Sequence, residues 1–341
     1  MRDRLLDLAY EVSRVTEEKV GVIDQVIRQT GILAINARLE AARAGAAGSA
    51  FSVVAQEMGS VAQSIREVSS ELRAAIGANV ALLESAGETL RRDLRGARFA
   101  DLSRNAVEII DRNLYERSCD VRWWATDSAV TSLLHDPNGA ARRYASERLA
   151  TILRSYTVYL DLWVADCEGR VIATGRPDRY PDAIGADVSR AEWFRQAMRC
   201  ESGEHFHVCD VARNAVLGSA PVATYSTAVR QDGATDGAPI GALGIFFDWA
   251  PQAAAIVGGV SLDEDERIGT RVMLLDANFR VIAASDGQGL LEEHYPLVID
   301  EPRRGYYQRD DHLVAYALTP GYETYAGLGW FGCIESPLRA R

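Results

Sequence analysis

The first part of the chain carries apolar side chains at alternating spacings of three and four residues, a heptad pattern that predicts helices packed side by side. The pattern breaks at residues 44–49, where Gly45 and Gly48 allow the positive φ angles with which a helix ends and the chain reverses. It restarts at Phe51, so we expect an antiparallel coiled-coil hairpin ending near Gly96, with residue i opposite roughly residue 95 minus i. The expected seam runs from Leu5 through Leu8, Val12, Val15, Lys19, Val22, Val26, Gln29, Leu33, Asn36, Glu40 and Arg43, then Phe51, Val54, Met58, Val61, Ile65, Val68 and Leu72.

A second apolar row flanks this seam on the first arm and includes Ile23, Ile27 and Ala34. Two rows make a stripe wider than one hairpin can bury, so we predict a homodimer in which two hairpins form a four-helix bundle. Near the bend the seam positions become polar. Buried polar residues in a coiled coil either fix the register of the helices or bind a partner protein. Their clustering at one end favours a partner.

Beyond Gly96 the helical pattern continues to Leu134, and a second helix is expected at 140–156. Alternating segments then predict two β-hairpins, each followed by further strands, with a helix at 190–200 between the first hairpin and its later strands. Because this order occurs twice, we expect two antiparallel sheets. The expected strands are 158–165, 171–174, 205–211, 220–230 and 240–247, then 271–275, 281–284, 305–308, 312–318 and 330–335.

Composition narrows the partners of the chain. A net charge of −11 over 341 residues argues against nucleic acid, since phosphate binding needs a concentrated basic surface. The five cysteines include no Cys-x-x-Cys pair, which fits a reducing compartment. Charges at Arg2, Asp3 and Arg4 exclude a signal-peptide core, and Asp248 interrupts the most apolar stretch, 238–260, which reads as a strand and a short helix. We therefore expect no membrane insertion and a cytoplasmic location.

The segment around the bend resembles the signalling tip of bacterial methyl-accepting chemotaxis receptors. In that family the tip binds the chemotaxis histidine kinase and its coupling protein, and it packs receptor dimers into trimers. The resemblance implies trimer contacts for Ile32, Leu33, Asn36, Glu40 and Arg43, and contact with the coupling protein for Phe51 and Val53. The matching residues are Gln29, Thr30, Ile32, Leu33, Ala34, Asn36, Glu40, Ala41, Ala42, Arg43, Ala44, Gly45, Gly48, Phe51, Val53, Val54, Ala55 and Glu57.

Some positions depart from the family pattern. Arg28 replaces an aromatic used in trimer packing, Ala46 replaces a glutamate at the bend, and Ser49-Ala50 replace Arg-Gly. A positive charge in place of a packed aromatic ring weakens trimers unless an acidic side chain forms an ion pair with it. The family's methylation sites lie many turns from the tip, whereas this first arm extends about 45 residues from the bend. We expect the pair Glu17-Glu18 to be a solvated face and the protein not to be methyl-accepting.

The second part of the chain, about residues 97–338, resembles the double Cache sensor domain, a two-module, PAS-like α+β fold. The resemblance lies in residues 166–174, 185–194, 240–245 and 329–337, which hold hairpin turns, a Trp-Phe pair on a helix and the closing strands. The expected fold is thus a mixed one, α + α/β. The signalling hairpin occupies residues 1–96 and the sensor 97–341, with a long helix at 97–134, a first module at about 140–262 and a second at about 263–338.

Cache domains bind small molecules, usually in the first module, between its sheet and the segment around the Trp-Phe pair. Aromatic walls with a few charged groups suit a small polar ligand such as an organic acid, an amino acid or an amine. Core packing is the competing interpretation for each aromatic residue taken singly. Ala191 stands where amino-acid-binding members have an arginine, two residues before the tryptophan, so the resemblance does not extend to that specificity. The candidate ligand-binding residues are Tyr159, Asp161, Trp163, Arg190, Trp193, Phe194, Asp210, Tyr225 and Asp248.

One further cluster has zinc-compatible residue types. Cys200, His205, His207 and Cys209 lie close together in the sequence, and on a strand His205, His207 and Cys209 would share a face. A sensor strand with incidental histidines is the favoured interpretation, and no metal or other cofactor is predicted. Phosphate loops, nucleophile elbows and zinc-protease helices do not occur in the sequence, so we expect no enzymatic activity.

These observations predict a dimeric, cytoplasmic, chemoreceptor-like signal transducer, possible also as a trimer of dimers. It would sense a small molecule through its Cache domain and contact the histidine kinase and coupling protein through its tip. The alternative is a ligand-binding dimeric scaffold whose tip no longer controls a kinase.

Overall fold

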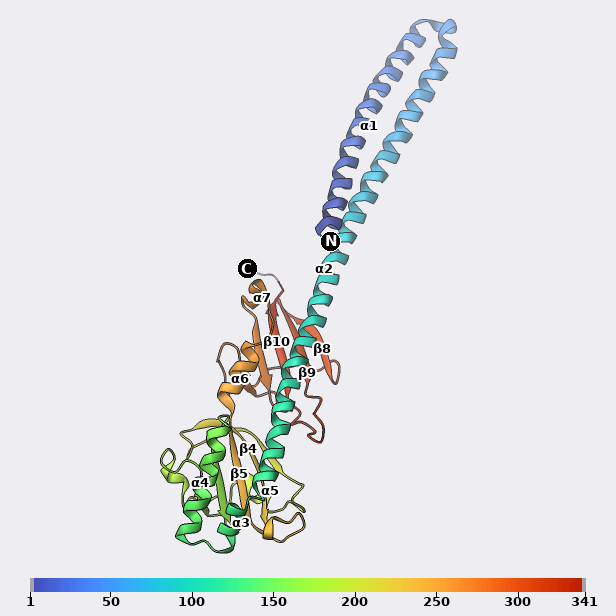
Figure 1. The fold of residues 1–341 in the computed structure, drawn as a ribbon. Helices are drawn as coiled ribbons and strands as arrows, with labels where there is room; N and C mark the ends of the chain where they lie inside the picture. The colour runs from blue at the N-terminus through green and yellow to red at the C-terminus, as the bar shows by residue number, and fades with distance from the viewer. Residues whose placement is uncertain (1–2, 339–341) are drawn as a thin grey trace. The chain divides into compact units, whose positions relative to one another are not determined.

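The computed structural model describes residues 3–338, with side chains from residue 9 onward. The chain divides into two compact units, Met1–Asp93 and Leu94–Arg341. The first is a helical hairpin and the second contains two five-stranded sheets (Figure 1). The mixed fold class and the antiparallel sheets expected from the sequence are confirmed.

The hairpin consists of helix α1 (Asp3–Arg43), a 3-10 turn η1 (Gly45–Gly48) and the first part of helix α2 (Ser49–Trp124). Gly45 adopts φ +60°, as the reversal requires. A Cβ on Gly48 would lie 2.1 Å from the backbone oxygen of Ala41, so only glycine lets the arms meet here. The bend expected at 44–49 is confirmed.

Two side-chain contacts check the register of the arms. Tyr10 donates a hydrogen bond to Glu84, and Arg73 forms a 2.7 Å ion pair with Asp24. The residue numbers add to 94 and 97, close to the expected sum of about 95.

The seam expected between the two arms is wrong. Most of its apolar members, among them Val12, Val22 and Leu33, are exposed in the single chain. Ile27 and Ala34 of the flanking row are buried instead, whereas Ile23 of that row is exposed. The buried positions recur every seventh residue, and most are small. They are Val20, Ile27, Ala34 and Ala41 on the first arm and Ala55, Ala62 and Ser69 on the second. Small side chains let two helices approach closely, which explains why this row, and not the row of larger residues, lies between the two arms. Leu5 and Leu8 lie outside the described side chains.

The second unit begins with the remaining part of α2. That helix ends at Trp124, so the single helix expected to continue to Leu134 is wrong. Asp127 accepts a hydrogen bond from the backbone N–H of Ala129 and thereby caps a new helix, α3 (Ser128–His135). Asn138 caps helix α4 (Gly139–Ser155) in the same way.

The first sheet has the strand order β2-β1-β5-β4-β3. Helices α3 and α4 contact one face, and helix α5 (Glu192–Ala197) packs on the other. The most apolar stretch of the sequence forms β5 and the following helix α6 (Trp249–Gly258), as expected. The strands are β1 (Tyr159–Asp166), β2 (Val171–Thr174), β3 (His207–Asn214), β4 (Ala220–Arg230) and β5 (Pro239–Asp248). Short 3-10 turns, η2 (Pro181–Ala183) and η3 (Gln231–Gly233), lie in the loops.

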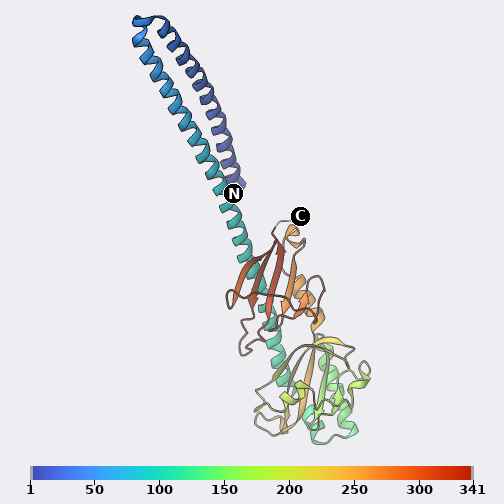
Figure 2. The same ribbon diagram turned by 180° about the vertical axis from the view of Figure 1, so that it is seen from behind.

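The second sheet repeats this order as β7-β6-β10-β9-β8, after a short helix α7 (Glu264–Arg267). Its strands are β6 (Arg271–Leu275), β7 (Val281–Ala284), β8 (Arg304–Arg309), β9 (His312–Leu318) and β10 (Phe331–Pro337). Both views show α2 running beside this sheet (Figure 1, Figure 2). The backbone of α2 comes so close to β10 that a Cβ on Gly332 would lie 2.4 Å from the backbone oxygen of Ser103.

A single hydrophobic core joins α2 to both sheets. Phe99, Val107 and Leu114 of α2 belong to the same buried cluster as residues of β1, β4, β5, β6, β9 and β10. The outer face of each sheet has a smaller cluster of its own. Between residues 3 and 338, no helix is long and apolar enough to cross a membrane.

Candidate functional site

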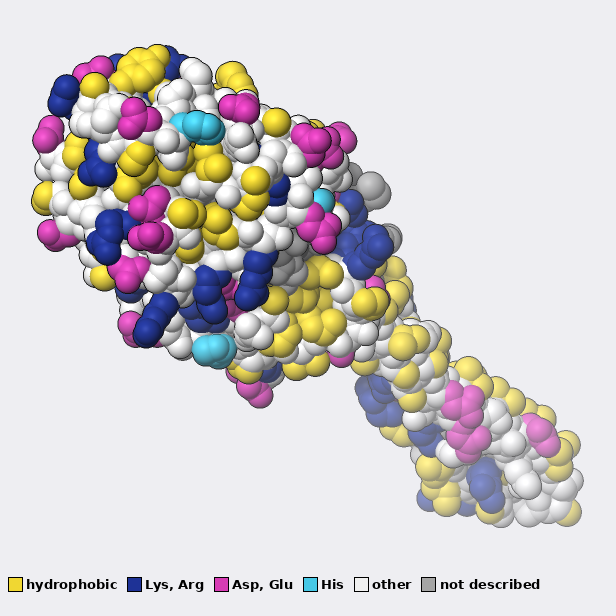
Figure 3. All heavy atoms as spheres, turned by 90° about the horizontal axis from the view of Figure 1, so that it is seen from below, with side chains coloured by type: hydrophobic (Ala, Val, Ile, Leu, Met, Phe, Trp, Pro, Cys, Tyr) yellow, Lys and Arg dark blue, Asp and Glu magenta, His cyan; other side chains and the backbone are white. Residues whose placement is uncertain are grey.

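The residues expected at the hairpin tip lie on its surface. Phe51 is 72% exposed and Val53 is 62% exposed, although both are apolar. Glu40 and Arg43 form a 2.6 Å ion pair one helical turn apart, and Asn36 is exposed beside them. Hydrophobic side chains also lie between charged ones along the hairpin surface (Figure 3). Contiguous apolar exposure is a general feature of interaction surfaces.

In the first sheet, the candidate ligand-binding residues separate onto two faces. Trp163, Trp193 and Phe194 pack together on the α5 side, where the rings of Trp163 and Phe246 lie 4.2 Å apart. A Cβ on Gly244 would lie 2.9 Å from the ring of Trp193. These aromatic residues therefore fill the space between α5 and the sheet as core.

Tyr159 and Tyr225 lie on the opposite face, in the core shared with α2. The Tyr159 hydroxyl donates a 2.5 Å hydrogen bond to Asp120 of α2, whose carboxylate also accepts from Arg117. A β-bulge between Tyr159 and Asp161 shifts the alternation of β1, so Tyr159 and Trp163 face opposite ways despite their even spacing. The sequence gives no signal for this bulge.

Asp161 is completely buried and fully hydrogen-bonded. Its carboxylate accepts from the backbone N–H groups of Leu162, Gly175 and Arg176 and from the Nε1–H of Trp163. All four donors belong to the fold itself. Asp161 thus holds the end of β2 against β1 in this structure.

The three remaining candidates lie apart from the aromatic cluster. Arg190 is exposed before α5, and Asp248 lies where β5 ends and α6 begins. Asp210 lies on β3, half-buried, and accepts a 2.7 Å hydrogen bond from the backbone N–H of Val211. Burial raises the pKa of Asp210 above its usual range. The nine candidates therefore do not line one common cavity in this structure.

A different group of side chains meets at the edge of the α5 face. His207 and Cys209 are two residues apart on β3 and therefore lie on the same face of that strand. Glu192 extends toward them from the first turn of α5. One ligand atom of each residue lies within 4.8 Å of the other two. Cys200 and His205, the other residues that the sequence suggested, do not belong to this group of described side chains. Sequence spacing could not find Glu192, because only the packing of α5 on the sheet brings it to β3.

Burial shifts the pKa values of both side chains on β3, His207 and Cys209. It lowers the pKa of His207 below its usual range, which keeps the imidazole neutral near pH 7. Burial, with the nearby charges of Glu192 and Asp210, raises the pKa of Cys209 to about 12. The group therefore presents a neutral imidazole, a thiol and a carboxylate.

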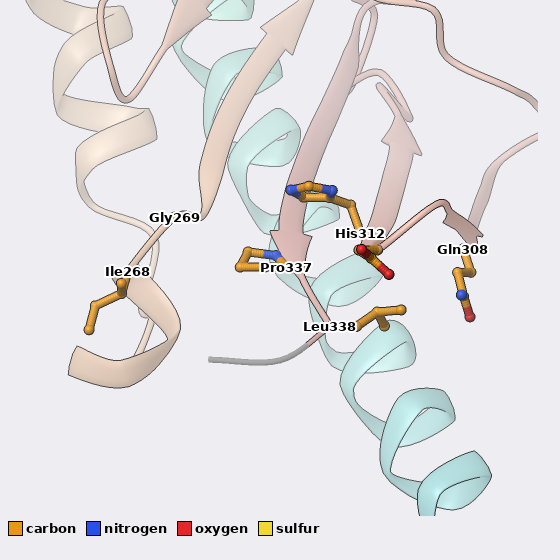
Figure 4. A pocket seen from close by; sticks show the side chains of 7 residues that line it. Ile268, Gly269, Gln308, His312, Pro337 and Leu338 are labelled. Atoms are coloured by element: carbon orange, nitrogen blue, oxygen red, sulfur yellow. The ribbon is translucent and has the colours of Figure 1, made fainter. Parts of the chain in front are cut away.

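The second sheet borders an open hollow of about 870 Å³ that the sequence did not predict (Figure 4). Its lining comes from the segment after α7, the turn between β8 and β9, and the end of β10. Among the described residues that line it, Asp311 and His312 carry the ionisable groups. The lining residues are Ile268, Gly269, Gln308, Asp311, His312, Pro337 and Leu338.

Comparison with known proteins identifies the N-terminal part. Residues 5–114 match the family model of the methyl-accepting chemotaxis protein (MCP) signalling domain. The resemblance expected for the hairpin is confirmed, and the match extends beyond residue 96 into the part of α2 that packs in the second unit.

Curated relatives match a part of this chain. Methyl-accepting chemotaxis protein I of Escherichia coli is 44% identical over 78 residues, which cover 21% of this chain and 14% of that protein. Methyl-accepting chemotaxis protein McpP of Pseudomonas putida is 35% identical over 115 residues, or 32% of this chain and 21% of that protein. The chain thus spans a small fraction of the length of these relatives.

Solved structures match the second unit. The sensor domain of the Vibrio cholerae histidine kinase DctB superposes with a TM-score of 0.54 at 12% identity, covering 72% of this chain and 98% of that one. The ligand-binding domain of the Pseudomonas aeruginosa chemoreceptor PctC, solved with GABA, gives 0.52 at 16% identity, covering 70% and 98%. The second unit therefore has the Cache-like fold expected from the sequence.

Proposed function

We propose that this protein is a chemoreceptor-like signal transducer, in which the second unit senses a small molecule and the hairpin tip contacts a chemotaxis histidine kinase and its coupling protein. The main support is that one helix, α2, belongs both to a region matching the MCP signalling domain and to a unit with a sensor fold. A ligand that favours one position of α2 in the sensor would bias the hairpin through continuous helix.

The exposed apolar row on the hairpin supports the homodimer. Val12, Val22 and Val26 on the first arm and Val61 and Val68 on the second are all exposed in the single chain. Burying such a row in a four-helix bundle removes apolar surface from water at about 25 cal/mol per Å². A trimer of dimers would use the residues nearer the bend, Ile32 and Leu33 among them.

A scaffold without kinase control is the second candidate. Arg28 is exposed on the first arm at a position where the resembled family packs an aromatic ring. Ala46 lies in the bend, where the resembled family has a glutamate, so the carboxylate of that glutamate is missing here. Such a protein would dimerise and bind its ligand without changing kinase activity.

Co-purification with the kinase and coupling protein tests the proposal. The full-length wild-type chain should retain both partners and change kinase activity when a ligand is added. Phe51→Ser and Val53→Ser should lose the partners, because both apolar side chains are exposed at the tip. Arg66→Ala, on the same helix and also exposed, is the matched control. Dimerisation without capture of either partner would favour the scaffold.

Breaking α2 tests the coupling. Leu94 is exposed at the start of the second unit, so Leu94→Ala should leave the helix and the signal intact. Leu94→Pro removes a helical hydrogen bond and clashes with the preceding turn, and it should abolish the ligand response while ligand binding persists. An unchanged response in Leu94→Pro would show that α2 does not carry the signal.

A further inference from the structure

The group formed by Glu192, His207 and Cys209 combines three kinds of metal ligand, a carboxylate oxygen, an imidazole nitrogen and a sulfur. This mixture is typical of zinc and neighbouring divalent transition metals rather than of magnesium or calcium, which prefer oxygen alone. The three residues come from two elements, β3 and α5, which pack directly on each other.

The distances between the ligand atoms of these three residues are close to those around a tetrahedrally coordinated metal ion. Zinc bonds of about 2.0–2.3 Å place neighbouring ligand atoms about 3.3–3.8 Å apart in a tetrahedron. The Nε2 of His207 lies 3.7 Å from an Oε1 of Glu192, within that range. All three ligand atoms lie within 4.8 Å of one another, so closure around an ion requires a shift of about 1 Å or less. The Glu192 side chain is 61% exposed and has room for that shift.

The imidazole nitrogen that faces this group has no hydrogen-bond partner. The Nε2 of His207 is buried, and its 3.7 Å separation from Glu192 is too long for a hydrogen bond. An unpartnered buried nitrogen costs stability unless something binds it. By contrast, the Nδ1 of His205 contacts the hydroxyl of Ser202 at 3.3 Å, and the Cys200 thiol contacts the carbonyl oxygen of Gln196 at 3.6 Å.

We propose that Glu192, His207 and Cys209 bind one divalent transition-metal ion, zinc by preference, and leave a fourth coordination position open. The open position follows from the count, since tetrahedral zinc takes four ligands and the chain supplies three. Water or a donor atom of a small molecule completes the coordination. The site goes beyond signalling and stands whether or not the hairpin controls a kinase.

Metal binding is measured on untagged full-length protein, stripped with a chelator and then titrated with zinc against a chromophoric competitor. We expect about one zinc per chain. His207→Ala, Cys209→Ser and Glu192→Gln should each weaken binding by about tenfold or more. His205→Ala and Cys200→Ser, the matched controls from the same segment, should bind zinc like the wild type.

Cobalt replaces zinc as a spectroscopic probe. The wild type should show a thiolate-to-cobalt charge-transfer band, and Cys209→Ser should lose it while keeping the far-UV circular dichroism of the wild type. Zinc well below one equivalent per chain, no thiolate band, or equal weakening by the His205 and Cys200 controls would each overturn the proposal.

Discussion

The two units of the chain bury their apolar residues in opposite ways. The hairpin hides mainly small residues, such as Ala34, Ala55 and Ala62, and exposes larger ones, such as Phe51 and Leu33. The second unit buries most of its largest rings, Trp163, Trp249 and Trp330 among them, although Trp123 is exposed. Burial of large apolar side chains is the main stabilising term in folding. The second unit obtains most of it within the single chain, and the larger side chains left exposed on the hairpin are the ground for the dimer that we propose.

Removing one large ring from each unit should give the greatest contrast. Trp163→Ala leaves a cavity between α5 and the sheet and should lower the free energy of unfolding of the second unit by about 3–5 kcal/mol. Phe51→Ala, on the exposed tip, should change stability by no more than about 0.5 kcal/mol. Urea unfolding of the full-length chain measures both. Equal losses would contradict the difference between the units.

The exposed row of the hairpin should be as sensitive to charge as a core. The double variant Val22→Glu, Val26→Glu should weaken the dimer at least about 100-fold, or about 2.8 kcal/mol, because it places unpaired carboxylates in the bundle. Sedimentation equilibrium gives the dissociation constant. Glu17→Gln, on the solvated face, is the control. A dimer that survives the double variant would place the interface elsewhere.

The small-residue row should be sensitive to size. Ala34→Leu overfills the space between the arms and should cost the hairpin about 1–3 kcal/mol. Ala78→Leu adds the same side chain at an exposed position and should be nearly neutral. Hydrogen exchange of the amides in α1 compares the two variants at one protein concentration. If Ala34→Leu protected these amides as well as the wild type, the arms would not be closely packed there.

A buried carboxylate should make the second unit mildly dependent on pH. Asp111 of α2 is buried, accepts a hydrogen bond from the backbone N–H of Gly321 and leaves its other oxygen unpartnered. Burial raises the pKa of Asp111 from 3.8 to about 6, so its protonated form is favoured by folding. The stabilisation is therefore present below about pH 4 and is lost as the pH rises through about 6.

Asp111→Asn should accordingly stabilise the protein by about 1–2 kcal/mol near pH 7.5 and have little effect near pH 4. Asparagine keeps an acceptor for the Gly321 N–H and cannot ionise. Thermal unfolding of both proteins at the two pH values measures the difference. A gain that does not change with pH would mean that ionisation of Asp111 is not its cause.

Much of the fold follows from local pattern. Gly45 and Gly48 predict the bend. The alternation of apolar residues and the turn residues predict the observed bounds of β2, β4, β6, β7 and β9. The break before α3 was missed, because the apolar spacing continues across it and only the cap at Asp127 shows that one helix ends and another begins.

The candidate site shows the limit of the same reasoning. Alternation places Tyr159 and Trp163 on one face, but a bulge in β1 separates them. The pair His207 and Cys209 can be read from strand spacing, whereas Glu192 joins it only through the packing of α5. Contacts between elements depend on how their surfaces fit, and this is not encoded in the spacing within either element.

The sequence by itself determined that there is a hairpin with a receptor-like tip, followed by two antiparallel sheets, because heptads, strand alternation and glycine turns are local signals. Only the tertiary structure decided which of two apolar rows lies between the arms. Both rows fit a helix equally well, and the row of small residues lies inside because it lets the two helices come closer together, leaving the larger side chains exposed on the surface of the single chain.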